Sequence, residues 1–513
     1  MFLDLAPGNL AEPLTGRALD RRTIMDQVRG RIERYLARSM SSGDRVLFLH
    51  GNTIEFFIDL LAVWSLGGCA IPVDSRLTPY EVETLAGAAL PRFALAQSNI
   101  DGAIVASLTK RSVEVLESSG KIEKRSLTPT ASLSGNLLSL DDPALILFTS
   151  GTTGHPKGVV HTHRSLRARW MSLRQTLGLE KFRRTLCLLP THFGHGLICN
   201  CLFPWLSGQD LFLLPPFKPD LLMKLGSILD DHRITFFSSV PAIWRLVLKT
   251  AQRPQAASVE RVFCGSAPLS ATLWSGIQEW TGTREVFNAY GITETGSWVA
   301  GTTIPNFTAE DGLVGEPWGA VIRILKTADT NVSPACAEEA VQGESGFVWI
   351  NTPALMQGYF GREDLTRKVV TQGWFVTGDI GFMNERGHLY LRGRAREEIN
   401  KGGTKVFPGD IDAVAEQFGG TIDVCSFGYE DSLYGENVGI ALVLKEPLET
   451  TLRALHAWMH SRLAKHQMPQ RWYTVEEIPR TSRGKINRDK VAAECGRRDP
   501  VDLRKVLAGP SYE

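Results

Sequence analysis

The sequence has 513 residues, of which 43% are hydrophobic and 22% are charged, a composition typical of globular proteins. This length exceeds one ordinary domain, so we expect two or more. A formal net charge of +1 gives no electrostatic basis for binding nucleic acid or an anionic membrane, so neither is an expected partner.

The eight cysteines are scattered along the chain. Cys199 and Cys201 form a C-x-C, but no second pair follows at zinc-ligand spacing, which favours structural thiols over a metal site. The first residues lack the basic start and continuous apolar segment of a signal peptide. The most apolar region, 56–73, contains an aspartate and two glycines, so we expect no membrane insertion and a cytoplasmic location.

Strand and helix patterns alternate in the first 300 residues. A four-residue apolar spacing predicts the first helix; it is formed by Ile24, Val28, Ile32 and Leu36. A strand at 45–49, a helix at 54–66 and a strand at 70–73 follow, and a second alternating section has strands at 186–190, 234–240, 262–264 and 286–287. This order predicts α/β layers with mostly parallel sheets. Residues 109–141 are polar and lack periodicity, so we expect an irregular surface connection there.

The pattern changes twice in the rest of the chain. Short segments at 321–325, 346–350 and 388–391 predict a β-rich subdomain. A new α+β unit follows, with a strand at 439–444 and a helix carrying Leu452, Leu455, Met459 and Leu463 on one face. We therefore predict an α/β protein with a large domain, 1–393, of layered α/β subdomains plus a β-rich subdomain, and a small α+β domain, 394–513. The stretch 497–513 is expected to be a loosely held tail.

One loop follows a short apolar strand, 144–148, and is rich in groups that bind phosphate. It contains Thr149, Ser150, Gly151, Thr152, Thr153 and Lys157. Glycines let the backbone approach phosphate oxygens, and hydroxyls and an ammonium supply donors. The pattern is not the P-loop GxxxxGK[ST], because Lys157 stands between Pro156 and Gly158. Taken alone, such a loop is more often an exposed glycine turn between two elements.

Further segments carry residue types that could take part in a chemical reaction. They are 263–268 (FCGSAP), 288–295 (NAYGITET), 373–381 (GWFVTGDIG), 391–394 (LRGR) with 399–406 (INKGGTKV), and 479–486 (PRTSRGKI). In their residues and in their order along the chain, these segments resemble the motifs of the adenylate-forming superfamily. This superfamily includes acyl- and aryl-CoA synthetases, peptide-synthetase adenylation domains and luciferases. The motifs run from residue 147 to residue 487, so the resemblance covers nearly the whole chain.

The resemblance implies a two-step reaction with ATP, Mg²⁺ and CoA as cofactors. A carboxylate attacks the α-phosphate of ATP to give an acyl adenylate and pyrophosphate, and a thiol then displaces AMP. The loop from Thr149 to Lys157 would hold phosphates, because negative charge accumulates there. Glu294 would hold Mg²⁺, a hard cation suited to oxygen ligands, and Thr293 would contact the α-phosphate.

The nucleoside would be held by residues of the later motifs. Asp379 matches the carboxylate that accepts both ribose hydroxyls, with Arg394 near the same sugar, while Tyr290 would stack on adenine. The remaining predicted ATP contacts are Gly265, Ser266, Asn288 and Gly291. Taken singly, Asp379 could instead cap a turn and Glu294 could begin a solvated helix.

Lys485 matches the family lysine that bridges the carboxylate and α-phosphate oxygens during adenylation. Taken alone, it could be a solvated lysine among Arg480, Arg483 and Arg488. For the second step the resemblance implies that the small domain is mobile and rotates at Arg396. The rotation would bring Lys401, Gly402 and Gly403 to the thiol channel, where glycine lets a pantetheine arm pass; a plain hairpin turn is compatible with this role.

The resemblance also places a pocket for the acid. Its predicted residues are His192, Phe193, Val240, Ala289, Gly291, Gly296 and Trp298. Phe193 occupies the position of the family's gating histidine or aromatic residue, with His192 and His195 nearby. His192 could contact the acid or simply be a hydrogen-bonded wall residue. Trp298 would shorten the pocket and favour a small or aromatic acid. No aspartate stands at the expected amino-group site near 192–195, which argues against an α-amino acid.

The leading hypothesis is an acid–CoA ligase. An enzyme that loads an acyl or aryl carrier protein is the first alternative, because the sequence at 400–403 resembles both CoA ligases and carrier-loading enzymes. A luciferase-like oxidase and a catalytically dead binding or scaffold protein are more remote. The joint presence of Lys485, Glu294, Asp379 and Arg394 speaks against the last of these.

Overall fold

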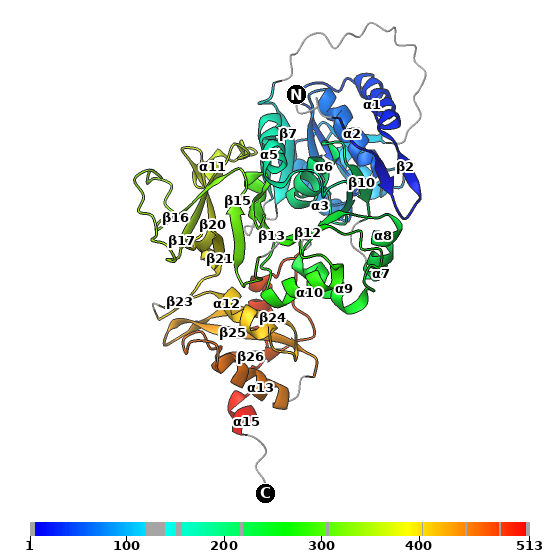
Figure 1. Cartoon of the computed structure of the whole chain (residues 1–513). Coiled ribbons are helices and arrows are strands. Elements are labelled where there is room, and N and C mark those ends of the chain that lie inside the picture. The colour runs from blue at the N-terminus through cyan, green and yellow to red at the C-terminus, as the bar shows by residue number, and fades with distance from the viewer. Residues whose placement is uncertain are drawn as a thin grey trace.

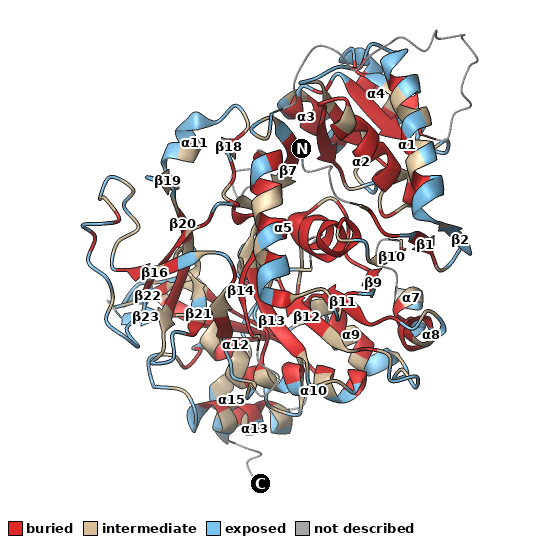
Figure 2. Cartoon of the chain, turned by 45° about the horizontal axis from the view of Figure 1, so that its top comes forward, coloured by how far each residue is buried: buried red, intermediate tan, exposed pale blue. Residues whose placement is uncertain are grey.

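The computed structural model describes residues 6–118, 139–149, 156–215, 219–303, 307–402, 404–446, 449–481 and 484–508. These residues form three β-sheets with helices packed on them (Figure 1). The first two sheets build the large upper part, and the third lies below it near the carboxyl end of the chain. The central strands are largely buried inside each part, and helices such as α1 (Arg21–Leu36) turn an exposed face to solvent (Figure 2).

The first sheet has seven strands in the described part of the chain. In spatial order they are β18 (Gly358–Tyr359), β8 (Lys157–Thr162), β7 (Pro143–Thr149), β4 (Cys69–Pro72), β3 (Arg45–Phe48), β5 (Phe93–Ala96) and β6 (Glu114–Glu117). Strands β7 to β6 in this order run parallel, whereas β8 is antiparallel to β7 and β18 to β8. The accompanying helices are α1, α2 (Ile54–Ser65), α3 (Pro79–Ala89) and α4 (Gly102–Lys110).

The second sheet joins a parallel half to an antiparallel half. In spatial order its main path is β16 (Val321–Leu325), β17 (Gly346–Asn351), β20 (Trp374–Met383), β21 (Leu389–Arg394), β15 (Leu313–Pro317), β14 (Ser297–Gly301), β13 (Val286–Ile292), β12 (Arg261–Gly265), β11 (Phe236–Ser239), β9 (Arg184–Cys187), β10 (Asp210–Leu213), β1 (Leu10–Glu12) and β2 (Arg17–Leu19), with β19 (Val370–Thr371) beside β20. Strands β13 to β1 in this order are parallel, and β16 to β14 are antiparallel. The parallel half ends at β13 and the antiparallel half begins at β14. Several strands therefore end there, close to residues of the sequence motifs.

The helices of this second part connect its strands. They are α5 (His163–Leu177), the π-helix η2 (His195–Leu202), α6 (Phe203–Trp205), α7 (Pro219–Met223), α8 (Leu225–Asp231), α9 (Pro241–Thr250), α10 (Ala271–Thr281), the 3₁₀ turn η3 (Thr293–Thr295) and α11 (Glu363–Arg367). Helix α9 begins at Pro241, whose fixed φ suits a first helical position. Its buried face packs on the sheet through Ile243, Trp244 and Val247.

The third sheet begins after the 3₁₀ turn η4 (Ala395–Glu397). Its strands are β23 (Thr404–Val406), β22 (Ile399–Lys401), β25 (Gly435–Leu444), β24 (Thr421–Asp431) and β26 (Arg471–Thr474), and its helices are α12 (Pro408–Glu416), α13 (Glu449–His460), α14 (Arg488–Cys495) and α15 (Leu503–Ala508). This small unit has its own apolar core. The chain thus passes from the second sheet to the third between Arg394 and Ile399. The division into domains 1–393 and 394–513 stays a proposal.

The predicted fold class is confirmed, but two sequence predictions are wrong. Residues 109–141 are not wholly irregular, because β6 lies within them and pairs with β5. It is an edge strand in which only Leu116 is buried, so its composition is polar. The stretch from 497 is not a loose tail up to residue 508: the Val501 amide donates to the Trp472 carbonyl, and Val506 on α15 is buried. Residues 509–513 lie outside the described part.

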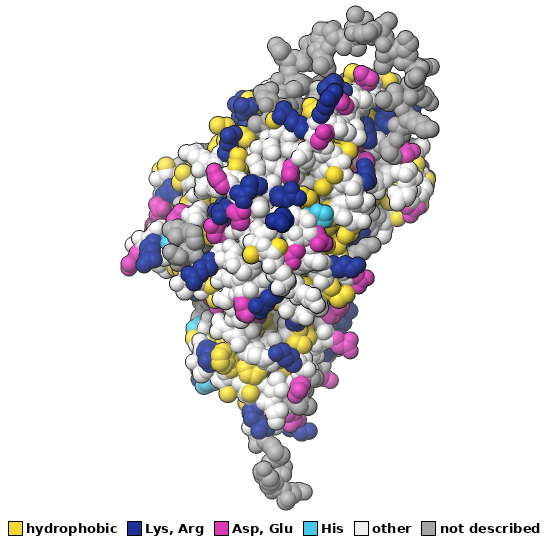
Figure 3. Space-filling view, turned by 45° about the vertical axis from the view of Figure 1, so that its right-hand side comes forward, with side chains coloured by type: hydrophobic (Ala, Val, Ile, Leu, Met, Phe, Trp, Pro, Cys, Tyr) yellow, Lys and Arg dark blue, Asp and Glu magenta, His cyan; other side chains and the backbone are white. Residues whose placement is uncertain are grey.

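No helix among the described residues is long and apolar enough to cross a bilayer. On the face drawn in Figure 3, lysine and arginine side chains are interspersed with aspartate and glutamate. This mixture agrees with the formal net charge of +1.

Candidate active site

The predicted phosphate loop connects two paired strands. Strands β7 and β8 are antiparallel, and their last registered pair joins Thr149 to Lys157. The Thr149 hydroxyl lies 3.5 Å from the Lys157 carbonyl. The other predicted loop contacts, Ser150, Gly151, Thr152 and Thr153, fall outside the described residues. The structure therefore fixes both ends of the loop and brings the Lys157 ammonium to the site.

Glu294 is linked to Lys157 through a tyrosine. The Tyr359 hydroxyl donates a 2.7 Å hydrogen bond to Glu294 Oε1, and Lys157 Nζ lies 5.8 Å from the Tyr359 ring centroid. Burial and the adjacent Glu294 charge raise the pKa of Tyr359, so the phenol stays protonated and keeps donating. One face of the site thus presents the Lys157 ammonium, which suits phosphate, and the Glu294 carboxylate, which suits a divalent cation.

The backbone of Thr293 is held by a buried histidine. His161 Nε2 lies 2.8 Å from the Thr293 carbonyl, and its Nδ1 lies 3.2 Å from the Ser165 hydroxyl. Burial lowers the pKa of His161 to about 4, so the ring is neutral near pH 7. A carbonyl oxygen only accepts hydrogen bonds, so the neutral imidazole carries its proton on Nε2 and donates it to Thr293. His161 therefore sets the position of the turn that carries Thr293 and Glu294.

Asp379 and Arg394, predicted to lie at the ribose, form one group with Tyr290, which was predicted to stack on adenine; Tyr290 and Asp379 are buried and Arg394 is half-buried. The Tyr290 hydroxyl donates to Asp379 Oδ2, and Arg394 Nε lies 2.6 Å from Asp379 Oδ1. The Asp379 charge raises the pKa of Arg394, while burial and the same carboxylate raise the pKa of Tyr290. The Thr377 hydroxyl accepts from the Asp379 amide. A carboxylate has about four lone-pair directions, so Asp379 can still accept ribose hydroxyls.

The predicted adenine edge lies where β12, β13 and β14 meet. A Cβ at Gly265 would come within 2.2 Å of the Ala289 carbonyl oxygen, and one at Gly291 within 1.9 Å of the Ser297 carbonyl oxygen. Both positions therefore require glycine. Asn288 is anchored by a 2.6 Å hydrogen bond to the Leu313 carbonyl. Ser266 has a φ of 66°, a strained conformation of the kind that clusters at functional sites.

Lys485 is brought to the large domain. A Cβ built on the neighbouring Gly484 lies 3.4 Å from Ala242 Cβ and 3.7 Å from Val240 Cγ2, which places this loop against α9. The charge of Lys485 also helps to lower the pKa of His195, after the larger effect of burial. The lysine predicted to be catalytic is thus near the pocket residues, although the two segments are far apart in sequence.

His195 contacts residues of both the predicted adenine edge and the predicted acid pocket. Its Nδ1 is 2.8 Å from the Ser266 hydroxyl and its Nε2 is 2.5 Å from the Ser238 hydroxyl. Burial and Lys485 lower its pKa to about 3, so the ring is neutral near pH 7. It begins η2, and π-helical turns are frequent at functional sites. The Trp298 ring contacts it edge-on at 5.5 Å.

The other predicted pocket residues differ in their surroundings. Phe193, Val240, Ala289 and Trp298 are buried, and Gly296 has a φ of 71°. Trp298 packs 4.7 Å from the Phe263 ring within an aromatic cluster. His192 Nε2 lies 3.6 Å from Asp74 Oδ2, so one of its polar contacts is to a neighbouring carboxylate.

The predicted hinge and thiol channel lie at the start of the small unit. Arg396 is in η4, with Nη2 3.9 Å from Glu397 Oε1. Lys401 ends β22, its Nζ lies 5.9 Å from the Tyr434 ring centroid, and the Gly402 amide donates to the Tyr434 carbonyl at 2.8 Å. Gly402 has a φ of 58°, which favours glycine. Gly403 lies outside the described residues.

Sequence reasoning did not include Tyr359, His161 or His195 in the predicted site. The Gly358-Tyr359 pair is a weak signal, because it gains meaning only when β18 pairs with β8. His161 follows two valines in β8 and has no motif around it. His195 was noted as a neighbour of Phe193, and its link to Ser238 and Ser266 depends on the fold.

The donor set fits a magnesium ion that arrives with the nucleotide. No group of three or more His, Cys, Asp or Glu able to hold a metal occurs among the described residues. Mg²⁺ is usually bound by one or two carboxylates together with substrate phosphates and waters. The single carboxylate of Glu294 meets that requirement.

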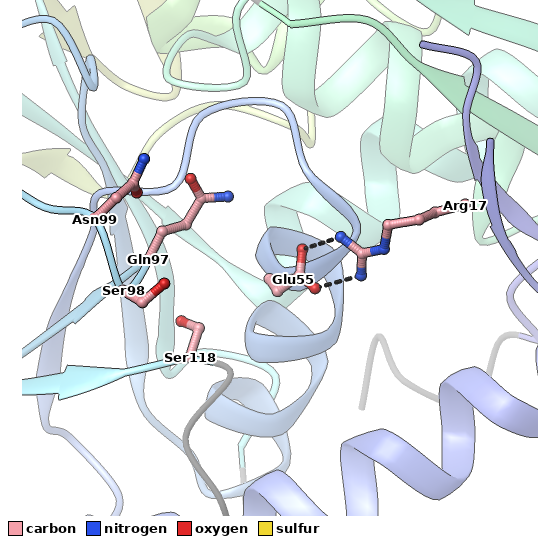
Figure 4. A pocket seen from close by; sticks show the side chains of 6 residues that line it. All are labelled: Arg17, Glu55, Gln97, Ser98, Asn99 and Ser118. Carbon is pink, nitrogen blue, oxygen red and sulfur yellow. Dashed lines mark hydrogen bonds and ion pairs between the residues drawn. The ribbon is translucent and has the colours of Figure 1, made fainter. Parts of the chain in front are cut away.

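A cavity of about 380 Å³ lies in the first α/β part of the chain (Figure 4). Its lining residues are Arg17, Glu55, Gln97, Ser98, Asn99 and Ser118. Arg17 and Glu55 form an ion pair across it. None of the predicted site residues lines this cavity, so it is separate from the candidate active site.

Comparison with protein families matches residues 29–360 to the family described as AMP-binding enzyme. The chain belongs to this family. A long-chain-fatty-acid–CoA ligase of Mycobacterium tuberculosis, FadD13, is 30% identical to this AMP-binding enzyme over 460 residues, covering 88% of each chain. A probable CoA ligase of Humulus lupulus, CCL9, is 29% identical and covers 89% of the present chain and 88% of its own.

Solved structures show the same fold. The ATP-bound MatB of Rhodopseudomonas palustris superposes on this AMP-binding enzyme with a TM-score of 0.82 at 22% identity, covering 96% of both chains. The predicted membership of the adenylate-forming superfamily is confirmed, and the protein is an acid–thiol ligase of the AMP-forming type.

Proposed function

We propose that this AMP-binding enzyme activates a small or aromatic carboxylic acid with ATP and transfers the acyl group to CoA. In the first step a carboxylate oxygen bonds to the α-phosphorus, and the bond to the pyrophosphate oxygen breaks. In the second step the thiol sulfur bonds to the acyl carbon, AMP leaves, and the thiol proton passes to solvent. ATP, Mg²⁺ and CoA are the cofactors of this scheme.

The position of Lys485 is the observation that carries the proposal. The Lys485 loop lies on Val240 and Ala242, and the ammonium charge reaches His195 in the pocket. A cation there offsets the repulsion between the acid and the α-phosphate, two anions that must approach. Asp379 and Arg394 would hold the ribose at the opposite end of the nucleotide.

The phosphates and the metal would be held between β8 and η3. Lys157 and the loop from Thr149 would contact the leaving pyrophosphate, Thr293 the α-phosphate, and Glu294 the Mg²⁺ ion. That ion would neutralise phosphate charge and help to orient the nucleotide. Tyr359 and His161 would act as positioning residues for Glu294 and Thr293.

The aromatic surroundings of His195 support a small or aromatic acid. Trp298 and Phe263 pack behind the imidazole, and Val240 is buried beside the Lys485 loop. We expect these side chains to leave only a short path for an acyl chain. The relatives do not identify the acid, because their names specify different ones: FadD13 is named for long-chain fatty acids and a relative of Arabidopsis thaliana for oxalate.

The second step would use a rotation of the small domain, 394–513, about Arg396. Lys401, Gly402 and Gly403 would then line the path of the thiol. A carrier-protein phosphopantetheine is an alternative acceptor with the same reacting group. The cytoplasmic location also stays a prediction.

A pyrophosphate-release screen tests this function. Purified full-length enzyme with ATP and Mg²⁺ is offered small, aromatic and long-chain carboxylic acids, each with and without CoA. We expect release with small or aromatic acids, and acyl-CoA when CoA is present. Adenylation without thioester formation on free CoA would favour a carrier protein, and no release with any acid would contradict the proposal.

A further inference from the structure

Helix α12 of the small unit contacts the large domain through two ion pairs, a more exposed one between Arg392 on β21 and Asp410 at 3.4 Å and a second one that is more buried. Arg245 on α9 is paired with Glu416, the last residue of α12, and their side chains are only 20% and 16% exposed. Next to it, Gln417 Nε2 donates a 3.0 Å hydrogen bond to Asp311 Oδ2 of the large domain. Figure 1 shows α12 at the top of the small unit, to the left of α10 and α9.

The same helix is tied to the segment that carries Lys485. Arg488, three residues after Lys485, has its Nη2 2.7 Å from Asp412 Oδ2 on α12 and its Nε 3.3 Å from Glu397 Oε2 in η4. Arg488 Nη1 also donates to the Ser426 carbonyl at 2.7 Å. Burial and paired carboxylates make these contacts mutually dependent, because removing one partner leaves the other charge buried. Helix α12 and the Lys485 segment therefore move together.

Helix α9 thus meets the small unit at two places. Its beginning contacts Gly484 through Val240 and Ala242, and Arg245 contacts Glu416 about one turn later. We propose that Arg245 and Glu416 are positioning residues, whose ion pair fixes α12 on α9 and thereby holds Lys485 over the site for adenylation. This inference rests on the proposed role of Lys485. The inference adds that a specific charge pair between the two domains favours the domain arrangement in which adenylation occurs.

Charge reversal of the full-length enzyme tests this inference. The variants are Arg245→Glu, Glu416→Arg and the double exchange. With the best acid from the screen, each single variant is expected to lower acid-dependent pyrophosphate release about tenfold, a usual size for coupling between two protein states. Thioester formation from preformed acyl-AMP and CoA should stay within about twofold of the wild type. The double exchange should restore most pyrophosphate release.

The exposed pair Arg253 and Glu279, joined at 2.6 Å within the large domain, provides the matched control. Arg253→Glu should leave both half-reactions unchanged. Hydrogen–deuterium exchange of the ligand-free proteins adds a readout independent of the acid: α9 and α12 should both exchange faster in Arg245→Glu and recover in the double exchange. Arg245→Gln replaces Arg245→Glu if charge reversal lowers the thermal midpoint.

Two results would overturn the inference. One is wild-type pyrophosphate release by the single variants. The other is an equal loss in both half-reactions that the double exchange does not repair. Lys485→Ala, measured in parallel, separates this failure from failure of the proposed function. If Lys485→Ala abolishes adenylation while the ion-pair variants behave as wild type, only the role of Arg245 and Glu416 is wrong.

Discussion

Tyr359 and Glu294 are 65 positions apart in the chain, yet they share a 2.7 Å hydrogen bond. A carboxylate that binds a metal works best when its orientation is fixed by a neighbouring donor. Tyr359 provides such a donor and also faces the Lys157 ammonium. At the scale of single residues, the site thus depends on side chains that hold the reactive groups in place.

Tyr359→Phe should raise the Mg²⁺ concentration needed for half-maximal pyrophosphate release and slow adenylation about tenfold. The reason is loss of one hydrogen bond to a charged group, worth roughly 1.5–3 kcal/mol. Tyr390→Phe is the control, because the Tyr390 hydroxyl makes a similar 2.7 Å bond to Glu310 at an exposed position. The same Mg²⁺ dependence in Tyr359→Phe and wild type would refute the positioning role.

His161 should make the fold sensitive to acid. Its pKa is about 4 in the fold and 6.5 in the reference state, so between these values the unfolded chain binds more protons. Stability therefore falls with decreasing pH across this window, by roughly 1.4 kcal/mol per pH unit for this group. His161→Gln keeps an N–H donor for Thr293 but cannot titrate.

The thermal midpoint measured from pH 7.5 to pH 5 tests this effect. The drop should be smaller in His161→Gln than in the wild type, whatever the midpoint at pH 7.5. His466 is exposed, and His466→Gln should keep the wild-type drop. An identical pH dependence in all three proteins would show that His161 does not titrate as proposed.

At the scale of elements, α2 shows how a charge can be buried in the first α/β part. Asp59 is fully buried and accepts hydrogen bonds from Tyr35 and Ser118 at 2.6 Å, with Arg31 at 2.9 Å. Burial alone would raise the pKa of Asp59, but the hydrogen bond and charge of His50, together with Arg31, outweigh it and lower the pKa. The carboxylate joins α2 to α1 and to the end of β6.

Asp59→Asn should lower the midpoint temperature of the first thermal unfolding transition by several degrees. The variant leaves Arg31 without its buried partner, and breaking a buried pair typically costs about 3–5 kcal/mol. Asp26→Asn removes an exposed pair with Arg29 on the neighbouring α1 and should leave the transition in place. Equal midpoints for Asp59→Asn and wild type in scanning calorimetry would contradict this account of the cluster.

The elements also show what sequence patterns could and could not predict. The strand at 321–325 and the helix beginning at 54 were predictable because their apolar periodicity is strong. Strand β6 and helix α15 were missed because they are short and gain stability only by pairing with β5 or packing on the small core. The order of the motifs suggested the site, but the contacts of His161, His195 and Tyr359 arise only from tertiary structure.

At the scale of the whole molecule, the small unit is docked so that the Lys485 loop lies on α9. This docking brings the charge of Lys485 close enough to affect His195, which lies beside the predicted acid pocket. Such an arrangement suits the first half of the proposed reaction. The second half would require α12 and the Lys485 segment to leave α9 together.

The central claim is that Lys485 drives adenylation, and Lys485→Ala tests it most directly. Lys490→Ala is the control, because Lys490 is an exposed lysine of the same segment whose ammonium pairs with Glu494 within α14. Acid-dependent pyrophosphate release at saturating ATP should fall about 10²–10³-fold in Lys485→Ala and stay normal in Lys490→Ala, while ATP still binds both. Near-normal pyrophosphate release by Lys485→Ala would contradict the account.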